Sequence, residues 1–147
     1  SMGLEIPILG SDTLDSNMVL EAASGSDVKL YVSTFYQEGG SPEFDEGIKA
    51  WLNEDATAMT NNGGNDTIAA VTAMGYDAYY VALEALKAAG STDPAAVKAA
   101  LPGVTYTGVT GDIAFDDIGD AIRDTAYIKV ADTANNAWAL ETMQKAG

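Results

Sequence analysis

The chain has 147 residues, 47% of them hydrophobic, which is enough to form a globular domain with a buried core. It carries 22 acidic residues against 7 basic ones, and the net charge of −15 disfavours binding to nucleic acids and to anionic membranes. Cysteine and histidine are absent, which excludes thiol nucleophiles, Ser-His and Cys-His dyads and imidazole ligands for zinc.

The first residues show no targeting signal. Ser1–Gly3 are interpreted as residues left from cloning, and the chain then enters an apolar run at Ile6–Leu9. A secretory signal would begin with a basic segment followed by a longer apolar run. We therefore expect either a cytosolic protein or a chain that begins in the middle of a longer one.

The next segments alternate between strand and helix patterns. Ile6–Leu9 fits a buried strand of an α/β sheet. Asp15 or Ser16 can cap the helix that follows. Val28–Phe35 is rich in β-branched and aromatic residues and predicts a second strand, after which Gly39-Gly40 indicates a linker or hinge.

Three helices are predicted in the middle of the chain. Ser41-Pro42 starts the first, with serine as the cap and proline in the first helical position. Asn65 or Asp66 is expected to cap the second, a long helix that runs to Ala89. Asp93-Pro94 starts a third, short helix by the same logic.

The last part of the chain is predicted to form strands. Tyr106–Phe115 contains two glycines and leads into a turn at Asp116–Asp120, and Ala126–Val130 and Ala137–Leu140 read as a hairpin around Asn135-Asn136. The order is β-α-β-α-α-α followed by antiparallel strands, an α/β class with a Rossmann-like parallel part. Few strands accompany the later helices, which indicates a chain cut from a larger one.

One acidic residue stands where ligands bind in open α/β sheets. Ser11 and Asp12 follow the first strand, and ligands bind beyond the carboxyl ends of such strands. A carboxylate there could pair with a ligand ammonium group. Position alone favours a local cap or Asx turn instead.

Three further features are open to more than one interpretation. Asp116–Asp120 is interpreted as a solvated turn, because its spacing does not match an EF-hand calcium loop. The stripe of tyrosines at positions 76, 79 and 80 is more typical of a core, although Tyr76 could line a pocket. Asp77 is expected to be a cap partner or a surface charge.

No constellation of catalytic residues is present, so we expect no enzyme and no cofactor.

Four segments together resemble one protein family. Ala73–Pro94 and the G-x-x-G-x-I-x-F-D-x-x-G-D pattern of Gly108–Asp120 are similar to stretches of the leucine/isoleucine/valine-binding proteins, and Pro7–Asp12 and Val32–Tyr36 match the same family in the same order. The resemblance covers the C-terminal portion of that family. It implies a partial type I periplasmic-binding-protein fold, in which two α/β lobes enclose a hinged cleft.

The resemblance also implies a ligand site. Asp12, next to Ser11, matches the acidic residue that holds the ligand's ammonium group, which reverses the preference for a local turn. Met74 and Tyr76 match a segment that enters the cleft from the other lobe. Residues 4–38 and 104–147 would then belong to the second lobe, and residues 39–103 to the first.

The resemblance implies that the parent protein delivers an amino acid, of the branched-chain type, to an ABC permease. The parent protein would be located in the periplasm or outside the cell, with or without a lipid anchor. A ligand-sensing receptor or regulatory module of the same fold is the alternative. Because the N-terminal half of the family is not represented, we expect the isolated piece to bind amino acids weakly or not at all. Its uncovered faces predict a homodimer or a strand-exchanged assembly.

Overall fold

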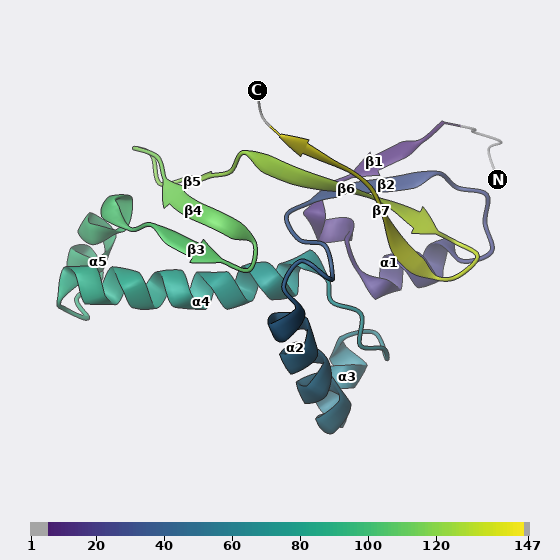
Figure 1. Cartoon of the computed structure of the whole chain (residues 1–147), viewed down its shortest axis with the longest axis horizontal. Coiled ribbons are helices and arrows are strands. Elements are labelled where there is room, and N and C mark those ends of the chain that lie inside the picture. The colour runs from purple at the N-terminus through teal and green to yellow at the C-terminus, as the bar shows by residue number, and fades with distance from the viewer. Residues whose placement is uncertain (1–5, 146–147) are drawn as a thin grey trace. The chain divides into compact units, whose positions relative to one another are not determined.

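The computed structural model describes residues 6–145, so the interpretation of Ser1–Gly3 lies outside the described residues. The chain forms two compact units (Figure 1). The first comprises the chain up to Val71 together with the residues from Thr125 onward, and the second is Thr72–Asp124. The assignment of residues 4–38, 39–103 and 104–147 to lobes remains a prediction.

The first unit is built on a four-stranded sheet in the order β1-β2-β6-β7. β1 (Ile8–Gly10) runs parallel to β2 (Leu30–Thr34). β2 is antiparallel to β6 (Thr125–Asp132), which forms a hairpin with β7 (Ala137–Lys145). The mixed sheet confirms the predicted α/β class and its antiparallel C-terminal strands.

The strand predicted at Ile6–Leu9 is present as β1 at Ile8–Gly10, but the prediction that it is buried is wrong. The side chains of Ile8 and Leu9 are 48% and 69% exposed. Within residues 6–145 β1 pairs with β2 alone, so it forms an edge of the sheet, whereas Val32 in β2 is fully buried. An apolar edge strand of this kind exposes hydrogen-bonding groups to other chains.

The first helix is capped by one of its two predicted residues. α1 (Asn17–Ala23) follows Ser16, whose hydroxyl accepts a hydrogen bond from the Val19 amide at 3.3 Å. Asp15 is not the cap, because its side chain points into the interior and binds other partners. The serine therefore supplies the acceptor that the start of the helix needs.

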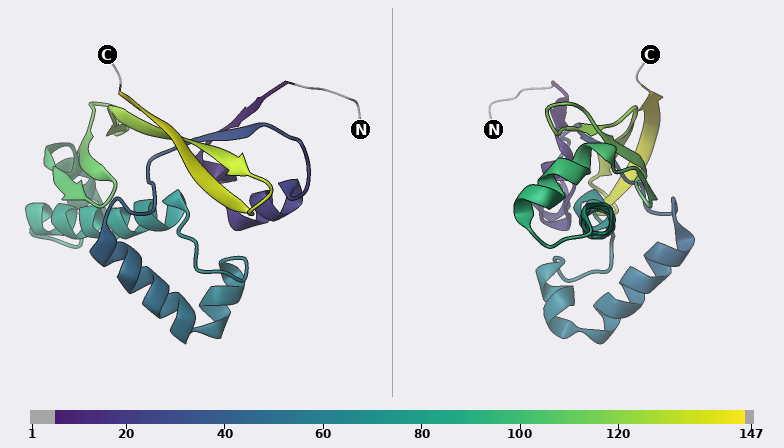
Figure 2. Two further views of the ribbon diagram at one scale, coloured as in Figure 1. Left: turned by 45° about the vertical axis from the view of Figure 1, so that its right-hand side comes forward. Right: turned by 90° about the vertical axis from the view of Figure 1, so that its left-hand side faces the viewer.

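Residues 6–145 contain one α-helix more than predicted. α2 (Pro42–Glu54) has proline in its first turn as predicted, but Ser41 makes no side-chain cap hydrogen bond. The additional helix α3 (Ala56–Asn61) begins because the Asp55 carboxylate accepts hydrogen bonds from the next two free amides, at 2.8 and 3.0 Å. Asp55 thus ends α2 and starts α3, and the two helices form the pair visible in Figure 2.

The long helix begins later than predicted. α4 (Ala70–Ala89) does not use Asn65 or Asp66 as its cap. The Asn65 side chain instead accepts from the Thr67 amide at 3.0 Å and from Asn17 at 2.7 Å, which holds this segment as a loop. The intervening residues are thus folded against α1 before the helix starts.

The core of the first unit lies between the sheet and its helices. Tyr36 and Phe44 pack edge to face, with ring centroids 5.6 Å apart. The largest apolar side chains buried there are those of Leu20, Leu30, Val32, Tyr36, Phe44, Leu52 and Ile68.

The second unit combines α4 with a short helix and a small sheet. α5 (Pro94–Ala100) and the 3-10 turn η2 (Leu101–Gly103) lead into β3 (Tyr106–Gly108) and β4 (Gly111–Phe115). These strands form an antiparallel sheet with β5 (Ala121–Ile122). None of the described helices is both long and apolar enough to cross a membrane.

The interior face of α4 is not the tyrosine stripe. Its buried residues are Ala70, Ala73, Asp77, Val81 and Ala85, spaced three or four positions apart, and the last two pack with Val104 and Ile113. Tyr79 is 62% exposed, so the interpretation of the stripe as core is wrong. The smaller side chains allow the sheet to approach the helix closely.

Candidate functional site

The turn that follows β1 carries two of the four residues expected to bind ligand. Asp12 begins the 3-10 turn η1 (Asp12–Leu14), and Ser11 precedes it in an extended conformation. The amides of Leu14 and Asp15 donate to the carbonyls of Ser11 and Asp12, each at 3.0 Å. The turn is therefore closed by its own backbone.

Asp12 is half-buried, and its carboxylate forms no hydrogen bond to any other described residue. The neighbouring hydroxyl of Ser11 is occupied by Thr13, at 2.9 Å. A carboxylate at the end of a strand that no cap or turn uses keeps its acceptor capacity for an external group. The structure thus does not support the local Asx turn that position alone favours.

Asp15 is a buried acid that sequence reasoning missed. It is 2% exposed, and its Oδ2 accepts hydrogen bonds from Lys129 Nζ at 2.9 Å, the Ala70 amide at 3.0 Å and Thr34 Oγ1 at 3.3 Å. Lys129 is also 2% exposed. The ion pair joins residues 114 positions apart, so no local pattern could have indicated it.

The other two predicted site residues lie on α4. Met74 is half-buried, and Tyr76 is 39% exposed. The Tyr76 hydroxyl donates to that of Tyr80 at 3.5 Å, and this hydrogen bond raises the pKa of Tyr76 to about 12. Tyr80 stacks on Tyr106 with ring centroids 6.0 Å apart. That all four residues line one ligand site remains a prediction.

Asp77 is neither a cap partner nor a surface charge. It is 1% exposed, and its carboxylate accepts hydrogen bonds from the Val109 amide at 2.9 Å and from the Thr110 amide and hydroxyl at 2.8 and 2.6 Å. A Cβ atom added at Gly108 would fall on this carboxylate. The glycine of the G-x-x-G pattern is needed for this close approach.

Arg123 also binds the turn that Asp77 holds. One guanidinium nitrogen donates to the carbonyl and the hydroxyl of Thr110, both at 2.9 Å. Burial lowers the pKa of Arg123, and the charge of Asp77 opposes that shift. The turn between β3 and β4 is therefore held by an acid on one side and a base on the other.

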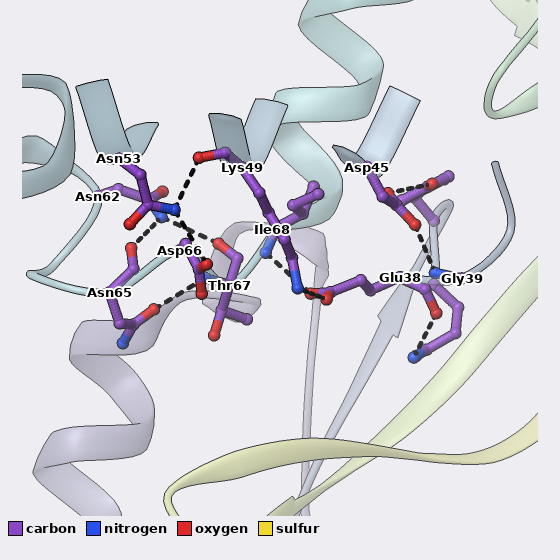
Figure 3. A network of polar contacts seen from close by, with 12 residues as sticks. Glu38, Gly39, Asp45, Lys49, Asn53, Asn62, Asn65, Asp66, Thr67 and Ile68 are labelled. Carbon is purple, nitrogen blue, oxygen red and sulfur yellow. Dashed lines mark hydrogen bonds and ion pairs between the residues drawn. The ribbon is translucent and has the colours of Figure 1, made fainter. Parts of the chain in front are cut away.

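A second polar network follows β2 (Figure 3). Asp45 accepts from Tyr36 Oη and the Gly39 amide, both at 2.6 Å, and Glu38 pairs with Lys49 and accepts from the Ile68 amide at 3.2 Å. Burial and the hydrogen bond to Asp45 raise the pKa of Tyr36. The hydrogen bond to Glu38 raises the pKa of Lys49.

These contacts fold Gly39-Gly40 into a hydrogen-bonded turn, and its role as a linker or hinge stays a prediction. The network borders a shallow groove of about 540 Å³. Both oxygens of Glu38 and both of Asp45 are occupied within the protein. The Gln37 Oε1 atom, by contrast, is buried without a hydrogen-bond partner among the described residues. Its lining residues are Gln37, Glu38, Gly39, Pro42, Asp45, Glu46, Lys49, Thr67, Ala137 and Trp138.

Asp116–Asp120 forms the predicted turn. Asp116 Oδ1 accepts from the amides of Ile118 and Asp120 at 3.0 and 2.9 Å, and Gly119 adopts a positive φ of 94°. Within residues 6–145 no group of three or more acidic side chains is placed to hold a metal ion.

Asp12 thus lies beyond the end of a strand in a mixed α/β sheet, the place where ligands bind in open α/β folds. The chain belongs to the periplasmic binding protein family, whose profile matches residues 1–135. This confirms the resemblance drawn from the four sequence segments. A comparison with curated proteins gives no match.

The solved structures that share the fold include a leucine-binding protein and a benzoate complex. The leucine-binding protein LivK from Thermotoga maritima MSB8 is 24% identical with a TM-score of 0.71, over 98% of this chain and 39% of that one. A solute-binding protein of an ABC transporter from R. palustris, in complex with benzoate, is 15% identical with a TM-score of 0.65, over 97% of this chain and 37% of that one. The chain thus spans about two fifths of the length of these proteins.

Proposed function

We propose that the chain is part of a substrate-binding protein that delivers an amino acid to an ABC transporter, in the periplasm or outside the cell. Family membership supports a role in solute binding. The observation that carries the ligand class is the Asp12 carboxylate, which has no hydrogen-bonded partner among the described residues and follows β1. A carboxylate in that position attracts an ammonium group.

The two structural neighbours bind ligands of different charge, and Asp12 helps to choose between the ligand classes. One of them is a leucine-binding protein, and the other was solved in complex with benzoate. Benzoate has a carboxylate and no ammonium group, so it would meet like charge at Asp12. Leucine carries the ammonium group that Asp12 can hold. We therefore propose an amino acid, of the branched-chain type, with Ser11, Met74 and Tyr76 as further contacts.

The chain itself should bind this ligand weakly. It spans about two fifths of its neighbours' length, and closure around a ligand needs both sides of a cleft. The test is an NMR titration of the isotope-labelled chain with L-leucine up to tens of millimolar, with benzoate in parallel. We expect the Asp12 turn to shift with leucine only, and Asp12→Ala to weaken leucine binding while leaving a residual affinity that the titration can measure.

Asp117→Ala is the matched control, because it removes an exposed carboxylate from another turn. Equal shifts with Asp12→Ala and with the unchanged chain would remove the basis for an amino-acid ligand. Low-micromolar affinity in calorimetry would contradict weak binding by this chain. A sensor of the same fold is the alternative function, and a neighbouring signalling gene rather than a permease gene would favour it.

We further propose that the chain associates through its uncovered surfaces, as a homodimer, as a strand-exchanged assembly or with the remainder of a longer protein. The apolar edge of β1 supports this, because such edges pair with other strands. Light scattering at increasing concentration tests self-association. A monomer up to millimolar concentration would exclude it.

A further inference from the structure

A buried acid lies immediately after the turn that carries Asp12. Asp15 Oδ2 receives three hydrogen bonds, from Lys129 in β6, Thr34 in β2 and the first amide of α4 at Ala70. Its other oxygen, Oδ1, is buried without a partner among the described residues. One side chain thus fixes the end of η1 to two strands and to the start of a helix.

Backbone hydrogen bonds connect the anchored Asp15 to Asp12. The amide of Asp15 donates to the carbonyl of Asp12 at 3.0 Å, and the amide of Leu14 donates to that of Ser11 at 3.0 Å. Within residues 6–145 no hydrogen bond holds the Asp12 side chain, so its place depends on the backbone of the turn. The anchored residue at the end of the turn is Asp15.

The charge of Asp15 does not compete with that of Asp12 for a ligand. Lys129 neutralises it at 2.9 Å, and both residues of the pair are 2% exposed. A binding group gains affinity when the surrounding residues hold it in its productive position before the ligand arrives. We propose that Asp15 is a positioning residue that fixes the turn bearing Asp12 for an amino-acid ammonium group. This inference rests on the proposed role of Asp12.

The test compares two uncharged replacements of the ion pair. Asp15→Asn with Lys129→Met keeps an oxygen that can accept from Ala70, whereas Asp15→Leu with Lys129→Met keeps none. Neither variant leaves an unpaired buried charge. Such a charge would destabilise the protein strongly. Two quantities are measured for each: hydrogen exchange at the Leu14 amide, and the dissociation constant for L-leucine by NMR titration, with and without Asp12→Ala.

In the Asp15→Leu variant we expect Leu14 exchange to accelerate about tenfold and the dissociation constant to rise about tenfold. Amides of the β6–β7 hairpin should keep their rates, and the Asp15→Asn variant should stay close to the unchanged chain. In the Asp12→Ala background, Asp15→Leu should add no further loss. A merely structural role would lower affinity equally in both backgrounds.

Unchanged Leu14 exchange in the Asp15→Leu variant would overturn the positioning role, and so would an equal loss of affinity with and without Asp12. The proposed function fails separately, if Asp12→Ala binds leucine as well as the unchanged chain does. In that event Leu14 exchange still decides whether Asp15 holds the turn.

Discussion

Removal of the Asp77 carboxylate should destabilise the protein strongly. Asp77→Ala deletes three hydrogen bonds and leaves the amides of Val109 and Thr110 without their acceptor. Each stranded amide costs about 1–3 kcal/mol, and the lower part of that range applies because these groups are only part-buried. The loss of the Thr110 hydroxyl contact adds about 1 kcal/mol, which gives about 3 kcal/mol in total.

Urea unfolding followed by circular dichroism at the helix band measures this free energy. Asp112→Ala is the control, because this exposed acid makes one hydrogen bond, to the Thr107 hydroxyl at 2.7 Å, and should change stability by less than about 0.5 kcal/mol. Asp77→Asn should recover only part of the loss, since its amide nitrogen would face a donor. A cost below about 1 kcal/mol for Asp77→Ala would refute the reasoning.

Three further predictions concern charge and pH. Lys129→Met should cost about 3 kcal/mol in urea unfolding, because Asp15 stays buried without its counter-charge, and Asp15→Asn in the same chain should recover part of it. The pKa of Tyr76 is raised to about 12, so its neutral form should stabilise the fold fully below pH about 10 and lose that effect between about 10 and 12. Ultraviolet titration should show the Tyr76 phenolate forming at a higher pH than an ordinary tyrosine, and at a lower pH in Tyr80→Phe than in the unchanged chain. Hydrogen bonds from Asn135 lower the pKa of Asp132. The ionised Asp132 should therefore stabilise the fold above pH about 4, and this effect should disappear as the pH falls through the folded-state pKa. NMR titration of Asn135→Ala should show the pKa of Asp132 returning toward its ordinary value.

Elements whose signals are local could be predicted from the sequence. The strand within Val28–Phe35 is present as Leu30–Thr34, and Pro42 starts α2. The hairpin around Asn135-Asn136 forms, and Asn136 adopts the left-handed conformation, with φ of 52°, that suits asparagine in a turn. In each case the residue types and their spacing determine the conformation without distant partners.

Features that depend on distant partners could not be predicted. The role of Asp15 follows from Lys129, which is 114 residues away, and the start of α4 is displaced because Asn65 binds Asn17. Asp77 did leave a signal, since it shares a four-residue period with the buried Ala73 and Val81. An acid on an apolar helix face requires partners, and the G-x-x-G turn supplies them.

For the candidate site, the pattern of strand and turn predicted where Ser11 and Asp12 lie, but not which carboxylate is free. That distinction required the contacts of both acids. Asp12 has no hydrogen-bonded partner among the described residues, whereas Asp15 Oδ2 accepts three hydrogen bonds. Whether Met74 and Tyr76 join Asp12 around a ligand stays a prediction.

The discontinuity of the first unit has a consequence for the order of folding. Its sheet joins β2 to β6, yet the whole of Thr72–Asp124 lies between these strands in the sequence. The second unit is contiguous, so its contacts close shorter loops and can form earlier. During synthesis on the ribosome, β2 can therefore pair with β6 only after the segment from Thr125 has emerged. The second unit emerges earlier and can fold before this pairing forms.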